Sequence, residues 1–148
     1  MKKSLKFPFL VALLLASLSP SNNAQQPSCN SPKNNAEQTE CAGQELTAAE
    51  ADLKQVLADI LRQYSEATEK GDTALPKSEE REQSHYDSKM RRTLMVSQRA
   101  WVQYRAAACM SVAEMYDGGT ITTQAALSCQ AALTRDRSKF LRDNFGEK

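Results

Sequence analysis

Two cysteines, Cys109 and Cys129, stand at nearly equal distances from a pair of neighbouring glycines, and this spacing constrains the fold more than any other feature. Cys109 lies nine positions before Gly118, and Cys129 lies ten positions after Gly119. If each flank is a helix, folding the chain back at the glycines brings the two thiols to the same height. We therefore predict an αα-hairpin that is cross-linked by a Cys109–Cys129 disulfide.

Four cysteines allow three pairings, and the hairpin leaves Cys29 to pair with Cys41. This second disulfide would tie the N-terminal segment to the first helix. Metal ligation is not favoured, because the sequence has no Cys-x-x-Cys pair and its single histidine, His85, lies in a polar stretch. We predict two disulfides, no metal site and no cofactor.

The N-terminus has the order of a secretory signal peptide: a basic start, an apolar run over residues 7–18 and a small polar end. The apolar run is shorter than the ~20 residues that a membrane-spanning helix needs. We predict a signal peptide over residues 1–24, with cleavage after Ala24, and an irregular leader over residues 25–36. No small-residue lipid-attachment pattern precedes Cys29. The mature protein is thus expected to be periplasmic or secreted, without stable membrane insertion.

The rest of the chain has helical periodicity without a strand-like alternation. A first helix is predicted from about residue 36 to 70, with apolar residues at three- and four-residue steps; a restart at Thr47 is an open alternative because Thr47 and Glu50 have capping-box spacing. A second helix should begin with the polar stretch at residues 78–85 and end at the glycine pair. Its predicted buried seam consists of Met90, Leu94, Ser97, Trp101, Tyr104, Ala108, Val112 and Met115.

A third helix should begin near Thr122 or Thr123 with a threonine cap and end around residues 144–146. It is expected to bury Ala126, Cys129, Leu133 and either Phe140 or Leu141. The predicted fold class is all-α: a small bundle of about three long helices with two disulfides, in one helical domain over residues 37–145.

The charge is unevenly distributed along the mature chain. Residues 25–82 carry 12 acidic and 6 basic side chains, whereas residues 83–148 carry 6 acidic and 10 basic ones. Either the two halves attract each other within the fold, or an acidic surface attracts a basic partner. Nucleic acid is not an expected partner, since the basic residues are interspersed with apolar helical positions and no aromatic stacking platform accompanies them.

Two arginines are predicted to lie beside apolar seams. Arg105 follows Trp101 by one helical turn, and Arg137 lies on the same helix side as Leu133. A charged group in such a place needs a partner, which could be an aromatic ring or a carboxylate that locks the helices together. A carboxylate or anionic-sugar ligand is the functional alternative, and Trp101 with Tyr104 could form a sugar-stacking platform instead of core.

No recognised catalytic pattern is present, and the carboxylates lie on helical faces, so we predict no enzymatic activity. The turn formed by Asp117, Gly118, Gly119 and Thr120 is the candidate partner-binding loop, because it is polar and adjoins a disulfide. A plain hairpin turn that needs glycine for its backbone angles would have the same sequence.

A pattern of separated residues runs through the predicted leader, the three predicted helices and the turn: Cys29, Cys41, Gln98, Arg99, Trp101, Tyr104, Arg105, Cys109, Gly118, Gly119, Thr120, Cys129, Leu133, Thr134 and Arg137. In this pattern the sequence resembles a family of secreted bacterial proteins that share the N-terminal domain of the lysozyme inhibitor LprI, long described as a domain of unknown function. The resemblance covers about residues 29–141. The chain departs from the family at Ala106, where an aspartate is frequent, which weakens any site that would use that carboxylate.

The resemblance implies a helical, disulfide-tied envelope protein and, as for the namesake, inhibition of lysozyme. We therefore expect a periplasmic protein that blocks lysozyme, itself a basic protein, by non-covalent occlusion. A general envelope interaction module without a lysozyme target is the alternative. A cell-wall hydrolase is a third possibility, which would require turnover of peptidoglycan.

Overall fold

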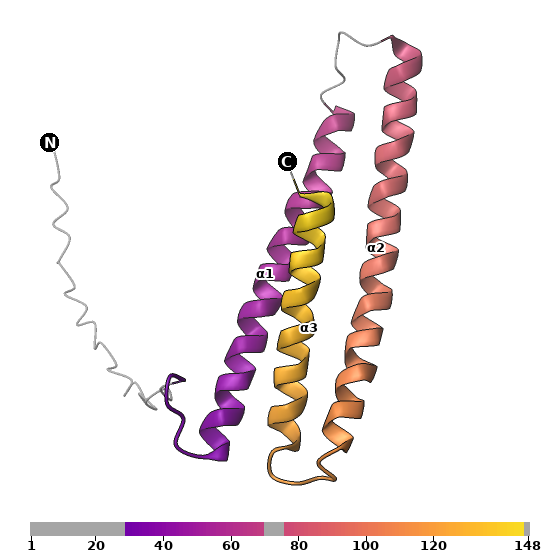
Figure 1. Ribbon diagram of the computed structural model, residues 1–148. Coiled ribbons are helices and arrows are strands. Elements are labelled where there is room, and N and C mark those ends of the chain that lie inside the picture. Colours follow the sequence, from indigo (N-terminus) through magenta and orange to yellow (C-terminus); the bar gives the residue numbers. More distant parts are fainter. Residues whose placement is uncertain (1–28, 70–75, 147–148) are drawn as a thin grey trace, which may run out of the picture.

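The computed structural model describes residues 29–69 and 76–146. The described residues form three α-helices, α1 (Asn35–Glu69), α2 (Lys77–Glu114) and α3 (Thr122–Phe145), and no strands. Figure 1 shows them as three long rods, with α2 running opposite to α1 and α3. The predicted all-α bundle is confirmed. The predicted signal peptide, residues 1–24, lies outside the described residues.

Both predicted disulfides are present. Cys29 is bonded to Cys41, and Cys109 is bonded to Cys129, with Cα–Cα distances of 5.5 Å in each pair. The second bond joins α2 to α3, while the first ties the segment before α1 to the second turn of that helix. Cys109 has no exposed surface, so this cross-link lies inside the bundle.

The start of α1 is stabilised by Asn34, whose side-chain oxygen accepts a hydrogen bond of 2.9 Å from the backbone N–H of Glu37. The Glu37 carboxylate in turn accepts from the backbone N–H of Lys33 at 2.6 Å. These reciprocal bonds satisfy donors that a helix start leaves free. No restart occurs at Thr47: α1 is continuous, and the Thr47 hydroxyl donates to the Gly43 carbonyl at 2.9 Å.

The threonine cap predicted for α3 is wrong. The helix begins at Thr122 as expected, but Ile121 occupies the capping position and no side chain caps the helix. The Thr122 hydroxyl is buried without a hydrogen-bond partner. The N–H of Ala125 instead bonds to the Ile121 carbonyl at 2.9 Å, so the first turn is held by the backbone.

The hydrophobic core lies along the faces where the three helices meet. Its centre is formed by Leu53, Val56, Ile60, Leu94 and Leu141, and Leu57, Leu61, Tyr64, Trp101 and Phe145 pack against it while partly exposed. Of the two residues proposed for the end of α3, Leu141 is fully buried and Phe140 is 49% exposed. Leu53, Val56 and Ile60 come from the apolar face of α1 that its helical periodicity predicted, so this face does supply the core.

The seam predicted for α2 is wrong at three positions. Tyr104 is 60% exposed, Met115 is 80% exposed, and Ser97 is also exposed. Leu94 is buried as predicted, while the inward face of α2 also contains Arg105 and Cys109, which the predicted seam did not include. Because successive helical residues are about 100° apart, a face centred on Arg105 turns the preceding Tyr104 outward.

The third helix is shorter than its neighbours. At a rise of 1.5 Å per residue, the 24 residues of α3 span about 36 Å and the 38 residues of α2 span about 57 Å. Figure 1 shows the last turns of α1 and the first turns of α2 extending beyond the end of α3. The turn between α2 and α3 thus lies at the end of the bundle where all three helices are present.

Candidate functional site

Three residues of the pattern that carries the family resemblance lie where the three helices pack together: Arg105, Thr134 and Arg137. Arg105 of α2 forms an ion pair with Glu50 of α1 at 2.8 Å and donates a hydrogen bond to the Thr134 hydroxyl of α3 at 2.7 Å. Thr134 is fully buried, and its hydroxyl donates a hydrogen bond to the Gln130 carbonyl at 2.6 Å. One guanidinium group therefore connects all three helices.

Arg137 of α3 makes the corresponding contacts to α2. Its guanidinium group donates to the side-chain oxygens of Gln98 at 3.2 Å and of Ser97 at 2.7 Å. It also lies over the rings of Trp101, at 6.0 Å, and Phe140, at 5.5 Å. Burial lowers the pKa of Arg137, yet an arginine remains charged at neutral pH. Arg137 was expected to have an aromatic ring or a carboxylate as a partner, and the rings of Trp101 and Phe140 are such partners.

Trp101 and Tyr104 do not form a common platform. The guanidinium groups of Arg105 and Arg137 lie 5.2 and 6.0 Å from the centre of the Trp101 ring, so both cations already contact this indole. Tyr104 is 60% exposed, whereas Trp101 is partly buried against the core. A shallow groove of about 260 Å³ between α1 and α2 adjoins Trp101 and is also lined by Glu50, Lys54 and Arg105.

The remaining motif residues support the packing to different degrees. Gln98 and Leu133 are partly buried, whereas Arg99 is exposed. The cluster around Arg105 is thus a structural junction between helices. Opposite charges in the two halves of the chain also meet here and nearby: Arg135 pairs with Glu45, and Arg142 pairs with Asp52.

Replacing Arg105 with alanine should lower the free energy of unfolding by about 1–3 kcal/mol, because it removes a charged hydrogen bond, an ion pair and a ring contact. The matched control is Arg99→Ala, which makes the same change on an exposed turn of the same helix and should stay within about 0.5 kcal/mol of wild type. Urea denaturation of both variants measures the difference. Equal stabilities would contradict the junction role of Arg105.

The turn between α2 and α3 has a defined backbone. Asp117 and Gly118 have positive φ angles of 43° and 71°. A Cβ atom at position 119 would lie 3.0 Å from the Tyr116 carbonyl oxygen. Gly118 is therefore favoured by its backbone angle, and Gly119 is favoured because a side chain would lack space. The N–H of Gly119 bonds to that carbonyl at 2.8 Å, and the Thr120 hydroxyl accepts a hydrogen bond from Asn35 of α1 at 3.0 Å. The predicted loop is therefore an ordered turn fastened to α1.

Sequence reasoning missed a buried carboxylate and an apolar surface. Asp87, only 1% exposed, accepts a hydrogen bond from Gln83 at 2.9 Å, while its other oxygen has no partner. Burial, with Tyr86 and Asp87 nearby, raises the pKa of Tyr64.

The apolar surface that sequence reasoning missed consists of large side chains on both sides of the turn, which remain exposed: Met110, Met115, Tyr116 and Ile121.

The described residues were also searched for metal-binding groups and membrane spans. No three histidine, cysteine, aspartate or glutamate side chains are grouped as a metal site would need within residues 29–69 and 76–146. No helix in the described part of the chain combines the length and the apolarity of a membrane span.

The chain was compared with protein families, curated proteins and solved structures. A family model described as lysozyme inhibitor LprI matches residues 29–141, which span all three helices and both disulfides. The chain belongs to the LprI lysozyme inhibitor family. No curated protein and no solved structure matches it. In this LprI family member, the match begins at the first cysteine and ends at the buried Leu141.

Proposed function

We propose that this protein binds a lysozyme and blocks it by non-covalent occlusion. The match of residues 29–141 to the lysozyme inhibitor family carries this proposal. Family membership alone does not fix an activity, so the support has to include a surface suited to binding. The ordered turn at Asp117–Thr120 provides one, because a segment that is already fixed loses little conformational entropy when it enters a cleft.

The proposed role requires export. We propose that residues 1–24 are removed as a signal peptide and that the mature protein acts in the periplasm or outside the cell, where disulfides persist. The two disulfides support this compartment. N-terminal sequencing of the protein recovered from periplasm should give Gln25 as the first residue. An intact Met1 on the recovered protein would contradict this.

The direct test is inhibition of cell-wall lysis. Mature protein, residues 25–148, should form a complex with at least one lysozyme from a panel of several classes and should lower the rate at which that lysozyme clears bacterial cell walls. The same assay on protein treated with reductant should show loss of inhibition, because the Cys109–Cys129 bond holds the turn.

Two results would contradict the proposal. If neither a complex nor a loss of lysis is found with any lysozyme, while a periplasmic pull-down recovers another endogenous partner, the protein is an envelope interaction module. If the protein alone releases fragments from peptidoglycan, it is a hydrolase. A reaction that contains the protein and peptidoglycan without lysozyme is therefore an essential control.

A further inference from the structure

Charge is separated along the length of the bundle. We call residues 29–53 and 106–134 the turn half, because they surround the connection between α2 and α3. The turn half has seven acidic side chains and one basic side chain, Lys33, and three basic residues lie at its borders: Lys54, Arg105 and Arg135. The acidic residues are Glu37, Glu40, Glu45, Glu50, Asp52, Glu114 and Asp117. The sequence alone suggested an acidic first half, whereas the fold adds the acidic hairpin turn to it.

Part of this acidic charge is neutralised within the protein. Glu45, Glu50 and Asp52 form ion pairs with arginines of α2 and α3. Glu114 and Asp117, which flank the turn, form no ion pair with any described residue. Their negative charge is therefore available to a partner.

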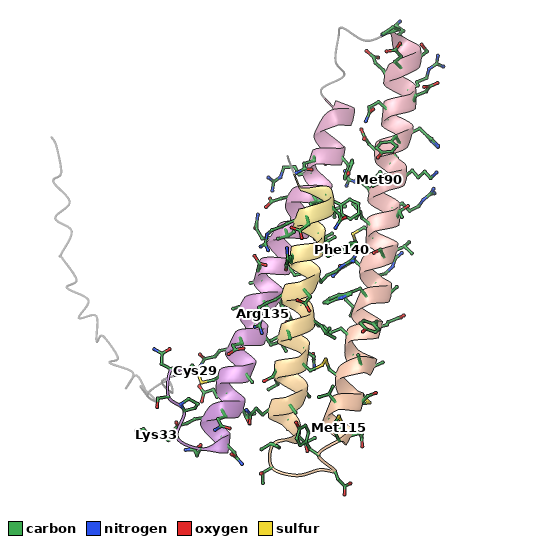
Figure 2. The ribbon with its side chains drawn as sticks, in the orientation of Figure 1. Cys29, Lys33, Met90, Met115, Arg135 and Phe140 are labelled. Carbon is green, nitrogen blue, oxygen red and sulfur yellow. A yellow bond between two sulfur atoms is a disulfide. The ribbon has the colours of Figure 1, made fainter. Side chains whose placement is uncertain are left out.

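The same end of the molecule exposes large apolar side chains. Met110 is 64% exposed, Met115 80%, Tyr116 41% and Ile121 37%. Figure 2 shows Met115 at this end, where α2 passes into the connection. Methionine and tyrosine are enriched in the centres of protein interfaces, while carboxylates belong to their rims. Apolar residues flanked by Glu114 and Asp117 have that arrangement.

The backbone beneath these side chains is held from three directions. The Cys109–Cys129 bond joins the two helices, the Asn35–Thr120 hydrogen bond joins the connection to α1, and the Gly119–Tyr116 hydrogen bond closes the turn. A surface fixed in this way loses little freedom on binding, which favours a stable complex.

We propose that Met110, Glu114, Met115, Tyr116, Asp117 and Ile121 form the docking surface for a basic protein. The inference rests on the proposed function in taking a lysozyme as that protein. Glu114 and Asp117 attract the basic partner and speed the encounter, whereas the apolar side chains are excluded from water and supply most of the affinity.

The apolar part of the docking surface is tested with Met115→Ser/Tyr116→Ser. This variant should weaken lysozyme binding about 10-fold or more, since truncating central aromatic and methionine anchors has the largest effects in interfaces. The matched control is Tyr86→Ser/Met95→Ser, which makes the same two changes at exposed positions of α2 that are remote from the turn. It should bind within about 2-fold of wild type, as changes outside an interface do. Surface plasmon resonance measures both, after circular dichroism has shown wild-type helicity.

The charged part is tested with Glu114→Gln/Asp117→Asn, which keeps the shape of both side chains. Its association rate should fall about 3- to 10-fold at low salt, and the difference should shrink as salt screens the charges. Asparagine tolerates the positive φ at position 117, so this variant retains the turn. The control Glu79→Gln/Glu82→Gln removes two exposed carboxylates at the opposite end of α2 and should leave the rate unchanged.

The outcomes separate the two proposals. If wild-type protein binds lysozyme and both turn variants bind like wild type, the docking surface is wrong and the proposed function stands. If the remote controls lose as much binding as the turn variants, the docking surface is also wrong. If wild-type protein binds no lysozyme, the proposed function fails and this inference fails with it.

Discussion

Replacing Cys109 and Cys129 together with serine should lower the free energy of unfolding by about 2–4 kcal/mol. The bond closes a loop of 20 residues and links α2 to α3 at a point where Cys109 is completely buried. Its loss gives the unfolded chain more freedom and places a serine hydroxyl in an apolar setting. Under the proposed function, the same variant should also inhibit lysozyme less well, since the turn loses one of the three links that hold it.

Chemical denaturation of the oxidised proteins measures this effect. The matched control is Cys29→Ser/Cys41→Ser, which removes the other disulfide and retains the hairpin cross-link. Because Cys29 is exposed and the segment before α1 adds little to the core, this control should lose less stability. A larger loss in the control than in the hairpin variant would contradict the central place of the Cys109–Cys129 bond.

Leu141→Ala should lower the free energy of unfolding by about 2–5 kcal/mol, which is the usual cost of removing a large aliphatic side chain from a core. Leu141 has no exposed surface and belongs to the same cluster as Leu53, Ile60 and Leu94, so the truncation leaves a cavity between three helices. The neighbouring residue supplies the control. Phe140 is half exposed, and Phe140→Ala should cost about 1 kcal/mol, chiefly from the lost contact with Arg137.

Thermal and urea denaturation of the two variants give the comparison. The contrast between adjacent residues tests the orientation of α3 in the bundle. Equal losses at positions 140 and 141 would mean that α3 is rotated relative to the described packing.

Much of the fold could be predicted from the sequence, because its main determinants are local. Helical periodicity and the position of the glycine pair at Gly118 placed the helices within a few residues of their observed bounds. The disulfides followed from the spacing of cysteines about the turn, which depends only on helix rise. The family was recognised from the same residues and is confirmed by the match over residues 29–141.

The rotation of α2 could not be predicted in the same way. Ala106, Ala107 and Ala108 are small on every side of the helix, so the apolar pattern does not favour one face. The inward face was decided by Arg105, whose partners Glu50 and Thr134 come from distant parts of the chain. A single sequence gives no sign of such pairings, and polar residues are ordinarily assigned to the surface.

The candidate site was predicted only in part. Glycine at the turn follows from its backbone angles, and the polar sequence suggested a contact loop. The exposed Met115 was assigned to the core, because an apolar residue at a helical period is ordinarily buried. Its exposure depends on where α2 ends relative to α1, which requires the three-dimensional arrangement.

The contacts of Arg105 also fix the axial register of the helices. Alanine-rich surfaces are smooth, and rods that touch through them can slide past one another at little cost. A slip of one helical turn, about 5.4 Å, would separate the guanidinium group from Glu50 or from Thr134. Together with the Cys109–Cys129 disulfide and the Asn35–Thr120 hydrogen bond, Arg105 thereby fixes how far each helix extends relative to the others, and with it the position of the hairpin turn beside the beginning of α1.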